Sequence, residues 1–233
     1  MKVLVIQNCQ IEDIGTYEDY FQDKNIDYTV VRAYDGREFP SIEYFDAFVV
    51  GGTPISVYKA HRHDFLRREL AYVGEIVKLD SPCLGICGGG QMVAKVLGAQ
   101  VRKNPVMEIG GYYVQLTPAG KNSKFFNGLP DQFPVFHWHG DTFDVPKGAE
   151  LLVEGVDCRN QAFCYRRALA LQFHLEVSPS IVSRWADEYS SELERIGKTK
   201  MQVVEECRIK EKQMKKLAYS LLDNFFAIAE SGQ

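Results

Sequence analysis

The chain has 233 residues and a formal net charge of −4, with 45% hydrophobic and 25% charged residues. This composition fits one large globular domain, and the acidic balance argues against a nucleic-acid partner, which needs a basic patch. No apolar run has the length of a membrane span, and the apolar N-terminal stretch is too short for a signal peptide. We therefore expect a cytoplasmic protein with no membrane partner, whose six cysteines are free thiols.

Strands and helices alternate along the first half of the chain. Apolar runs rich in β-branched residues predict strands, and stripes of apolar residues at helical spacing predict helices. We expect strands at 2–7, 28–34, 48–50 and 82–86, and helices at 15–24, 61–79 and 92–97. This alternation predicts a three-layer α/β/α domain with a mainly parallel central sheet.

The second half is richer in strands separated by short turns. We expect strands at 112–117, 135–139, 151–154, 161–165 and 169–173, and a helix from 178 towards 194. Some of these strands should form a small antiparallel extension, while the last rejoins the main sheet. The whole chain, 1–233, is predicted to be one domain that ends in a helical extension at 200–231.

An amphipathic helix is expected at 203–229. Leu217, Leu221, Phe225 and Ala229 recur every four residues along it. Such an apolar stripe favours a helix that packs on its own domain, and the alternative is a helix that docks onto a partner.

The segment 85–91, Gly-Ile-Cys-Gly-Gly-Gly-Gln, lies between an expected strand and an expected helix. A cysteine in this position, with glycines two residues before and after it, is the cysteine form of a nucleophile elbow. The turn is so sharp that side chains at those flanking positions would collide, and the positive end of the helix dipole favours a thiolate. Cys87 is therefore the candidate nucleophile, and the other five cysteines, which lack a glycine frame, are assigned to packing or surface positions.

A cysteine nucleophile needs a base, and the segment 172–176, Gln-Phe-His-Leu-Glu, supplies one. Residues two apart on an extended backbone point to the same side, so His174 and Glu176 are expected to hydrogen-bond. The carboxylate would orient the imidazole, which would take the Cys87 proton and later give it to the leaving amine.

An acyl-transfer site also needs donors for an oxyanion. One is expected to be the backbone N–H of Gly88, directly after the nucleophile. The second could come from the segment 51–54, Gly-Gly-Thr-Pro, where glycines would let the backbone approach the substrate closely. An ordinary turn at the end of a strand is the alternative for this segment.

The remaining histidines carry weaker signals. His61 and His63 lie two apart on an expected helix and so do not share a face, which indicates a solvated surface. His137 and His139 alternate with aromatic residues on an expected strand. No third metal ligand is evident beside them, so no metal site is predicted, and the edge of a polar pocket is favoured instead.

Together these segments resemble the class I glutamine amidotransferases. Segment 85–91 matches the family's Gly-x-Cys-x-Gly-x-Gln, segment 172–176 matches Gln-Phe-His-Pro-Glu, and segment 51–54 is similar to the Gly-Gly-Pro oxyanion loop. Residues 139–141 match the His-Gly-Asp of the glutaminase domain of GMP synthase. The resemblance runs from residue 3 to about 179 and is closest to stand-alone GMP-synthase-like amidotransferases.

This resemblance implies a flavodoxin-like fold and a triad of Cys87, His174 and Glu176. It also implies oxyanion donors at Gly88 and Gly52. Substrate contacts are implied for Gln91 and for the backbone around Trp138, Gly140 and Asp141, with no cofactor. The implied reaction is hydrolysis of the glutamine side-chain amide through a γ-glutamyl thioester.

Two departures from the family pattern matter. Leu175 replaces the proline before Glu176, which should loosen the local backbone but keep both catalytic groups. Thr53 is inserted into the oxyanion pattern, so the second donor could be Thr53 instead of Gly52.

Three functions remain open at this stage. The first is glutamine hydrolysis with ammonia passed to a separate synthetase or acceptor subunit, since no phosphate-binding loop of Walker type is present. The second is a free-standing hydrolase of γ-glutamyl amides or peptides, and the third is a non-catalytic regulatory subunit.

Overall fold

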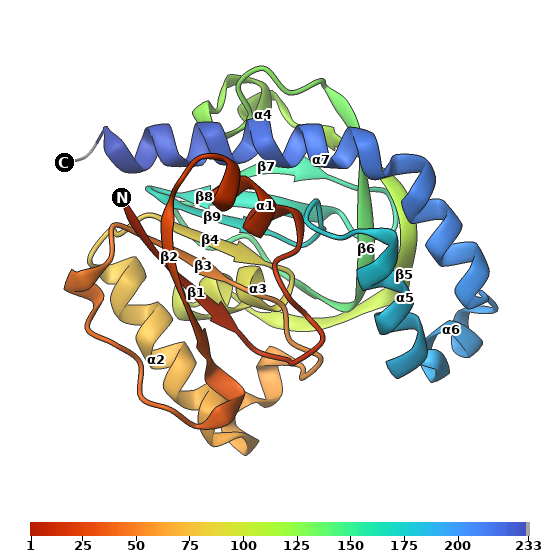
Figure 1. Cartoon of the computed structure of the whole chain (residues 1–233), viewed down its shortest axis with the longest axis horizontal. Helices are drawn as coiled ribbons and strands as arrows, with labels where there is room; N and C mark the ends of the chain where they lie inside the picture. Colours follow the sequence, from red (N-terminus) through yellow and green to blue (C-terminus); the bar gives the residue numbers. More distant parts are fainter. Residues whose placement is uncertain (232–233) are drawn as a thin grey trace.

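A single nine-stranded sheet forms the centre of the protein (Figure 1). The structure, a computed structural model, describes residues 1–231. The strand order of the sheet is β2-β1-β3-β4-β9-β8-β7-β5-β6. The strands are β1 (Lys2–Gln7), β2 (Asp27–Arg32), β3 (Ala47–Val50), β4 (Cys83–Ile86), β5 (Val101–Leu116), β6 (Gln132–Phe143), β7 (Glu150–Glu154), β8 (Asn160–Tyr165) and β9 (Ala168–Leu171). The neighbours in the part β2-β1-β3-β4-β9 pair in parallel, as expected. The neighbours in the part β9-β8-β7-β5-β6 pair antiparallel and form the expected antiparallel extension.

Helices cover both faces of the sheet and complete a three-layer α/β/α arrangement. They are α1 (Thr16–Asp23), α2 (Asp64–Lys78), α3 (Gly88–Val96), α4 (Pro118–Asn122), α5 (Pro179–Glu188), α6 (Ser190–Ile196) and α7 (Lys200–Glu230). Of the helices within residues 1–231, none is both long and apolar enough to cross a membrane.

The core is divided in two by the sheet, because successive strand residues point to opposite faces. On β1, Val3 and Val5 pack in one apolar cluster, while Leu4 and Ile6 pack in the other. The first cluster lies under α1, α5 and α7, and the second lies under α2 and α3. Strands buried on both faces explain the continuous apolar runs in the sequence.

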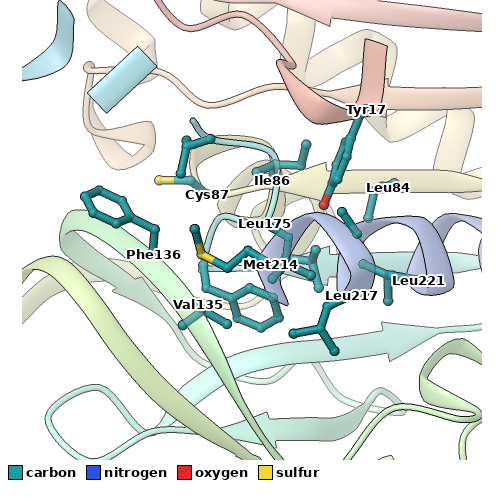
Figure 2. Close-up of a cluster of buried hydrophobic side chains, with 14 of the residues drawn as sticks. Tyr17, Leu84, Ile86, Cys87, Val135, Phe136, Leu175, Met214, Leu217 and Leu221 are labelled. Atoms are coloured by element: carbon teal, nitrogen blue, oxygen red, sulfur yellow. The ribbon is translucent and has the colours of Figure 1, made fainter. Parts of the chain in front are cut away.

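The long helix α7 packs on the sheet face below the nucleophile strand. Its residues Met214, Leu217 and Leu221 lie in the same cluster as Leu84 and Ile86 of β4 (Figure 2). All five side chains are at most 6% exposed. The prediction that this amphipathic helix packs on its own domain is confirmed.

Several predicted elements differ from the structure. Strand β5 begins at Val101, eleven residues before the predicted start. The prediction missed this first part because it carries polar residues and a register shift between Lys103 and Glu108. The expected helix 61–79 starts only at Asp64, and a 3-10 turn, Val57–Arg62, precedes it, so His61 and His63 lie outside the helix. The strand expected at 28–34 ends at Arg32.

The expected single helix 178–194 is broken into α5 and α6 at Tyr189. Tyr189 leaves helical geometry, with φ −104° and ψ 32°. Its hydroxyl donates to Glu12 Oε1 at 2.8 Å, which holds the ring against the pocket described below. No proline or glycine marks this break in the sequence.

Candidate functional site

The sharp turn at Cys87 joins β4 to α3. Cys87 has a φ of 50°, a conformation that is strained for a residue with a side chain. A Cβ at Gly85 would lie 2.6 Å from the backbone of Gly89, and one at Gly89 would lie 2.1 Å from the Val50 carbonyl. The predicted need for glycine two residues before and after Cys87 is therefore confirmed.

His174 and Glu176 follow β9, the strand next to β4 in the sheet. The expected hydrogen bond is present, since His174 Nδ1 lies 2.5 Å from Glu176 Oε1. Leu175 donates its backbone N–H to Glu176 Oε2 at 3.0 Å, a bond that a proline could not make. This bond ties the backbone at Leu175 to the carboxylate, and the looser backbone expected there stays a prediction.

The electrostatic environment favours a charged His174 ring. Burial lowers the pKa of His174, but the Glu176 carboxylate and the Cys87 thiol outweigh it and raise the pKa well above its usual range. A hydrogen bond with the Cys87 side chain also contributes to this rise, so the imidazole lies within reach of the thiol for proton exchange. The ring also packs edge-on against Trp185, with centroids 5.1 Å apart.

The Cys87 sulfur lies among polar groups from β6 and from the segment that follows β9. Its Sγ is 3.9 Å from the carbonyl oxygen of Trp138 on β6 and 3.7 Å from the Gln172 side-chain amide. Gln172 also accepts a hydrogen bond from Gln91 Nε2 at 3.2 Å. The role of Gln172 as a link between the sulfur and Gln91 could not be read from its place in the motif.

The loop after β3 lies directly beside the elbow. A Cβ built at Gly88 would lie 2.8 Å from the backbone nitrogen of Thr53, and one at Gly52 would lie 3.8 Å from Cys87 Cβ. The same position at Gly52 would lie 2.7 Å from Glu12 Oε2, so a side chain there would require the Glu12 carboxylate to shift. The two expected oxyanion segments are thus neighbours in space.

A buried pair of polar side chains, Asn8 and Glu69, is hydrogen-bonded to the start of this loop at Gly51. Asn8 Nδ2 donates to the Gly51 carbonyl at 3.2 Å and to Glu69 Oε1 at 2.9 Å. Glu69, on α2, is fully buried, and burial raises its pKa to about 8 although the Asn8 hydrogen bond lowers it. The Glu69 carboxyl is therefore mainly protonated at neutral pH.

This raised pKa predicts a pH-dependent stability. Folded Glu69 holds its proton more tightly than the unfolded chain, whose Glu pKa is about 4.5. Its stabilising contribution is complete below pH 4.5 and is lost as the pH rises through about 8. Urea unfolding should show a Glu69 contribution that falls by about 2 kcal/mol between pH 6 and 7.5.

The Glu69→Gln variant should lose this part of the pH dependence. Glu75→Gln, an exposed position on the same helix, should keep it. Equal pH slopes in wild type and Glu69→Gln would contradict the raised pKa.

A cavity of about 450 Å³ opens at Cys87 and His174. The predicted substrate residues Gln91, Trp138, Gly140 and Asp141 all line it. Glu176 lies behind His174, and Gly52 and Gly88 lie behind the cavity surface, whereas Thr53 lines it. The structure thus gathers four separate sequence motifs around one cavity.

Several lining residues come from segments that carry no motif. Trp138 Nε1 donates to Glu192 Oε2 of α6 at 2.8 Å, and the Tyr189 hydroxyl donates to Glu12 Oε1 at 2.8 Å. Burial raises the pKa of Glu12 from its usual value. Arg195, also on α6, lines the mouth of the cavity. These contacts join residues 54 and 177 positions apart, and no local periodicity marks them.

Behind the cavity wall lies a third ligand-type residue beside His137 and His139. Glu108 on β5 faces both histidines on β6, and its Oε2 is 2.9 Å from His139 Nε2 and 4.0 Å from His137 Nε2. The view that no third metal ligand accompanies this pair is therefore wrong. Glu108 and His139 lie opposite each other on the paired strands β5 and β6. Glu108 was not recognised as a third ligand because it lies in the part of β5 that was not predicted to be a strand.

Known proteins share this fold and are similar in sequence. A family model described as glutamine amidotransferase class-I matches residues 14–183. A glutamine amidotransferase of known structure from Thermotoga maritima is 37% identical, with a TM-score of 0.90 and 97% of each chain covered. The glutamine amidotransferase-like protein YfeJ of Salmonella typhimurium is 28% identical over 214 residues, covering 89% of this chain and 90% of YfeJ.

A longer enzyme matches only in part. The glutamine-hydrolysing GMP synthase of Syntrophomonas wolfei is 34% identical over 137 residues, which are 58% of this chain and 25% of the synthase. The chain therefore aligns with only about a quarter of that enzyme's length. From the family match over residues 14–183 and the shared fold, the chain belongs to the class I glutamine amidotransferases.

Proposed function

We propose that the protein hydrolyses the side-chain amide of glutamine to glutamate and ammonia. Cys87 attacks the amide carbon, His174 transfers the thiol proton to the leaving nitrogen, and the C–N bond breaks, so that ammonia departs and a γ-glutamyl thioester remains on Cys87. Water activated by His174 then attacks the thioester carbonyl, the C–S bond breaks, and the proton returns to the sulfur. Glu176 orients the imidazole and stabilises its charged form.

The observation that carries this proposal is the convergence of Cys87 and the His174–Glu176 pair on one cavity. The sulfur stands on a strained elbow, and the imidazole is bonded to a carboxylate through one nitrogen and interacts with the Cys87 side chain. This arrangement fits a nucleophile with an oriented proton carrier.

The oxyanion would be held by backbone N–H groups beside the elbow. We assign one donor to Gly88 and the second to the loop of Gly52 and Thr53. The closeness of Gly88 to the Thr53 nitrogen supports this assignment. Gln91, Trp138, Gly140 and Asp141 would position the glutamine, since they line the same cavity.

The ammonia would pass to an acceptor bound by a separate synthetase subunit. The likeness to part of GMP synthase, whose name describes a glutamine-hydrolysing enzyme, supports this transfer. The chain itself would act as one glutaminase domain with α7 as its C-terminal helical extension, because α7 packs on the same core as the nucleophile strand.

A second substrate class is favoured by the size of the cavity. A volume of about 450 Å³ lies in the range of pockets that hold drug-sized ligands, so it leaves room beyond a glutamine side chain. The enzyme could then cleave γ-glutamyl amides that carry a larger group on the nitrogen, with water as the acceptor.

Both candidates are tested by one assay on the isolated protein. Ammonia release from glutamine is measured beside amine release from γ-glutamyl dipeptides, with Cys87→Ala as the control. Cys87-dependent release from glutamine with little dipeptide cleavage is the expected result. Preferred cleavage of dipeptides would move the assignment to a γ-glutamyl hydrolase, and the absence of any Cys87-dependent release would contradict both.

A further inference from the structure

Three buried side chains with metal-binding groups lie at and behind the wall of the cavity. Glu108, His137 and His139 each offer one ligand atom, and these atoms all lie within 4.8 Å of one another. The three side chains are no more than 2% exposed. On the paired strands Glu108 lies opposite His139, and His137 is on the same face two residues earlier.

The hydrogen bonds of His139 fix which ring nitrogen can bind a cation. His139 Nδ1 lies 3.0 Å from the Asp141 carbonyl, which can only accept, so Nδ1 carries the proton. In the neutral ring Nε2 then presents a lone pair. It is 2.9 Å from Glu108 Oε2 but makes no hydrogen bond within residues 1–231. A nitrogen lone pair and a carboxylate oxygen this close repel each other unless they share a proton or a metal ion.

The contact geometry favours a metal ion over a proton. A proton on Nε2 would need the carboxylate oxygen on the axis of the N–H bond, and the missing hydrogen bond at 2.9 Å shows that the oxygen is off that axis. A metal ion about 2.0–2.2 Å from each ligand accepts this angle. We propose that Glu108, His137 and His139 bind one divalent transition-metal ion of the Zn²⁺ class.

The surroundings resemble those of known metal sites. Two imidazoles and a carboxylate are a ligand set that zinc takes, with a fourth position left for water. Metal-bound histidines usually donate their other N–H to an oxygen, and bound carboxylates are hydrogen-bonded in turn. Here the Asp141 carbonyl accepts from His139, and Gln161 Nε2 donates to Glu108 Oε2 at 3.1 Å.

The position of the ion suggests a structural role. His139 lines the cavity, which provides an entry route for the ion. The neighbouring residue Trp138 places its carbonyl against the Cys87 sulfur. An ion that joins β5 to β6 would therefore stiffen the wall against which the sulfur lies.

The test is a Zn²⁺ titration of chelator-treated protein by calorimetry. The Cys87→Ala background is used, because the thiolate at the cavity could bind zinc by itself. We expect one ion per chain, an unchanged affinity when His61→Ala is added as an exposed control, and at least tenfold weaker binding with His137→Ala. Glu108→Gln should weaken binding similarly.

A second measurement does not depend on how the variants fold. Zn²⁺ in excess should raise the melting temperature of the Cys87→Ala protein itself, because the ion binds the folded state. Absence of stoichiometric binding to that protein would overturn the proposal. Binding that is equally tight with His137→Ala, in protein shown by near-ultraviolet circular dichroism to be folded, would also overturn it.

Discussion

Cys87→Ala is expected to lower the turnover of glutamine by at least about a thousandfold. Cys87 is the one cysteine among the described residues that line the cavity, so no other thiol can form the acyl intermediate. The variant should still bind glutamine, because Gln91 and the Trp138 strand stay in place. Ammonia release measures the first effect, and calorimetry with glutamine measures the second.

Cys164→Ala is the matched control for this variant. Cys164 is a partly buried free thiol on β8 that does not line the cavity, so its removal should leave turnover nearly unchanged. A Cys87→Ala protein that kept a tenth of the wild-type rate would show that the reaction uses another nucleophile.

The second large effect concerns the proton carrier. His174→Ala should lower kcat/KM by about 10²–10⁴-fold, the usual contribution of a positioned acid or base. Glu176→Gln should cost less, because it removes the orienting carboxylate and keeps the imidazole. His61→Ala, at an exposed histidine, should have no effect on the rate.

The pH profile separates the two roles. The Glu176 carboxylate raises the pKa of His174, and burial alone would lower it. Without that negative charge the imidazolium should lose its proton at a lower pH, so the alkaline limb of kcat/KM should move to lower pH in Glu176→Gln. An alkaline limb that stays in place would mean that Glu176 does not control the charge of His174.

Local sequence patterns were sufficient to predict the elbow and the His174–Glu176 pair. The elbow depends on glycines within a few residues of Cys87, and the pair depends on the two-residue period of a strand. The parallel half of the sheet was predictable for a similar reason, since its buried strands are short apolar runs between helices.

The rest of the site depends on contacts between distant segments. Tyr189 lies at a break between two helices and bonds Glu12, and Glu108 meets His139 because the unpredicted first part of β5 includes Glu108 in the same register as the later pairs. The first part of β5 has no apolar alternation, since it contains Arg102, Lys103, Asn104 and Pro105. Pairing with β6 therefore overrides the weak local preference for a strand there.

The central claim is that glutamine is cleaved through a thioester on Cys87, and intact-protein mass spectrometry after rapid acid quenching tests it most directly. Protein mixed with glutamine should carry one γ-glutamyl group, located on the peptide that contains Cys87, and the Cys87→Ala protein should carry none. Rapid ammonia release with no adduct on Cys87, or with an adduct on another residue, would contradict the proposed mechanism.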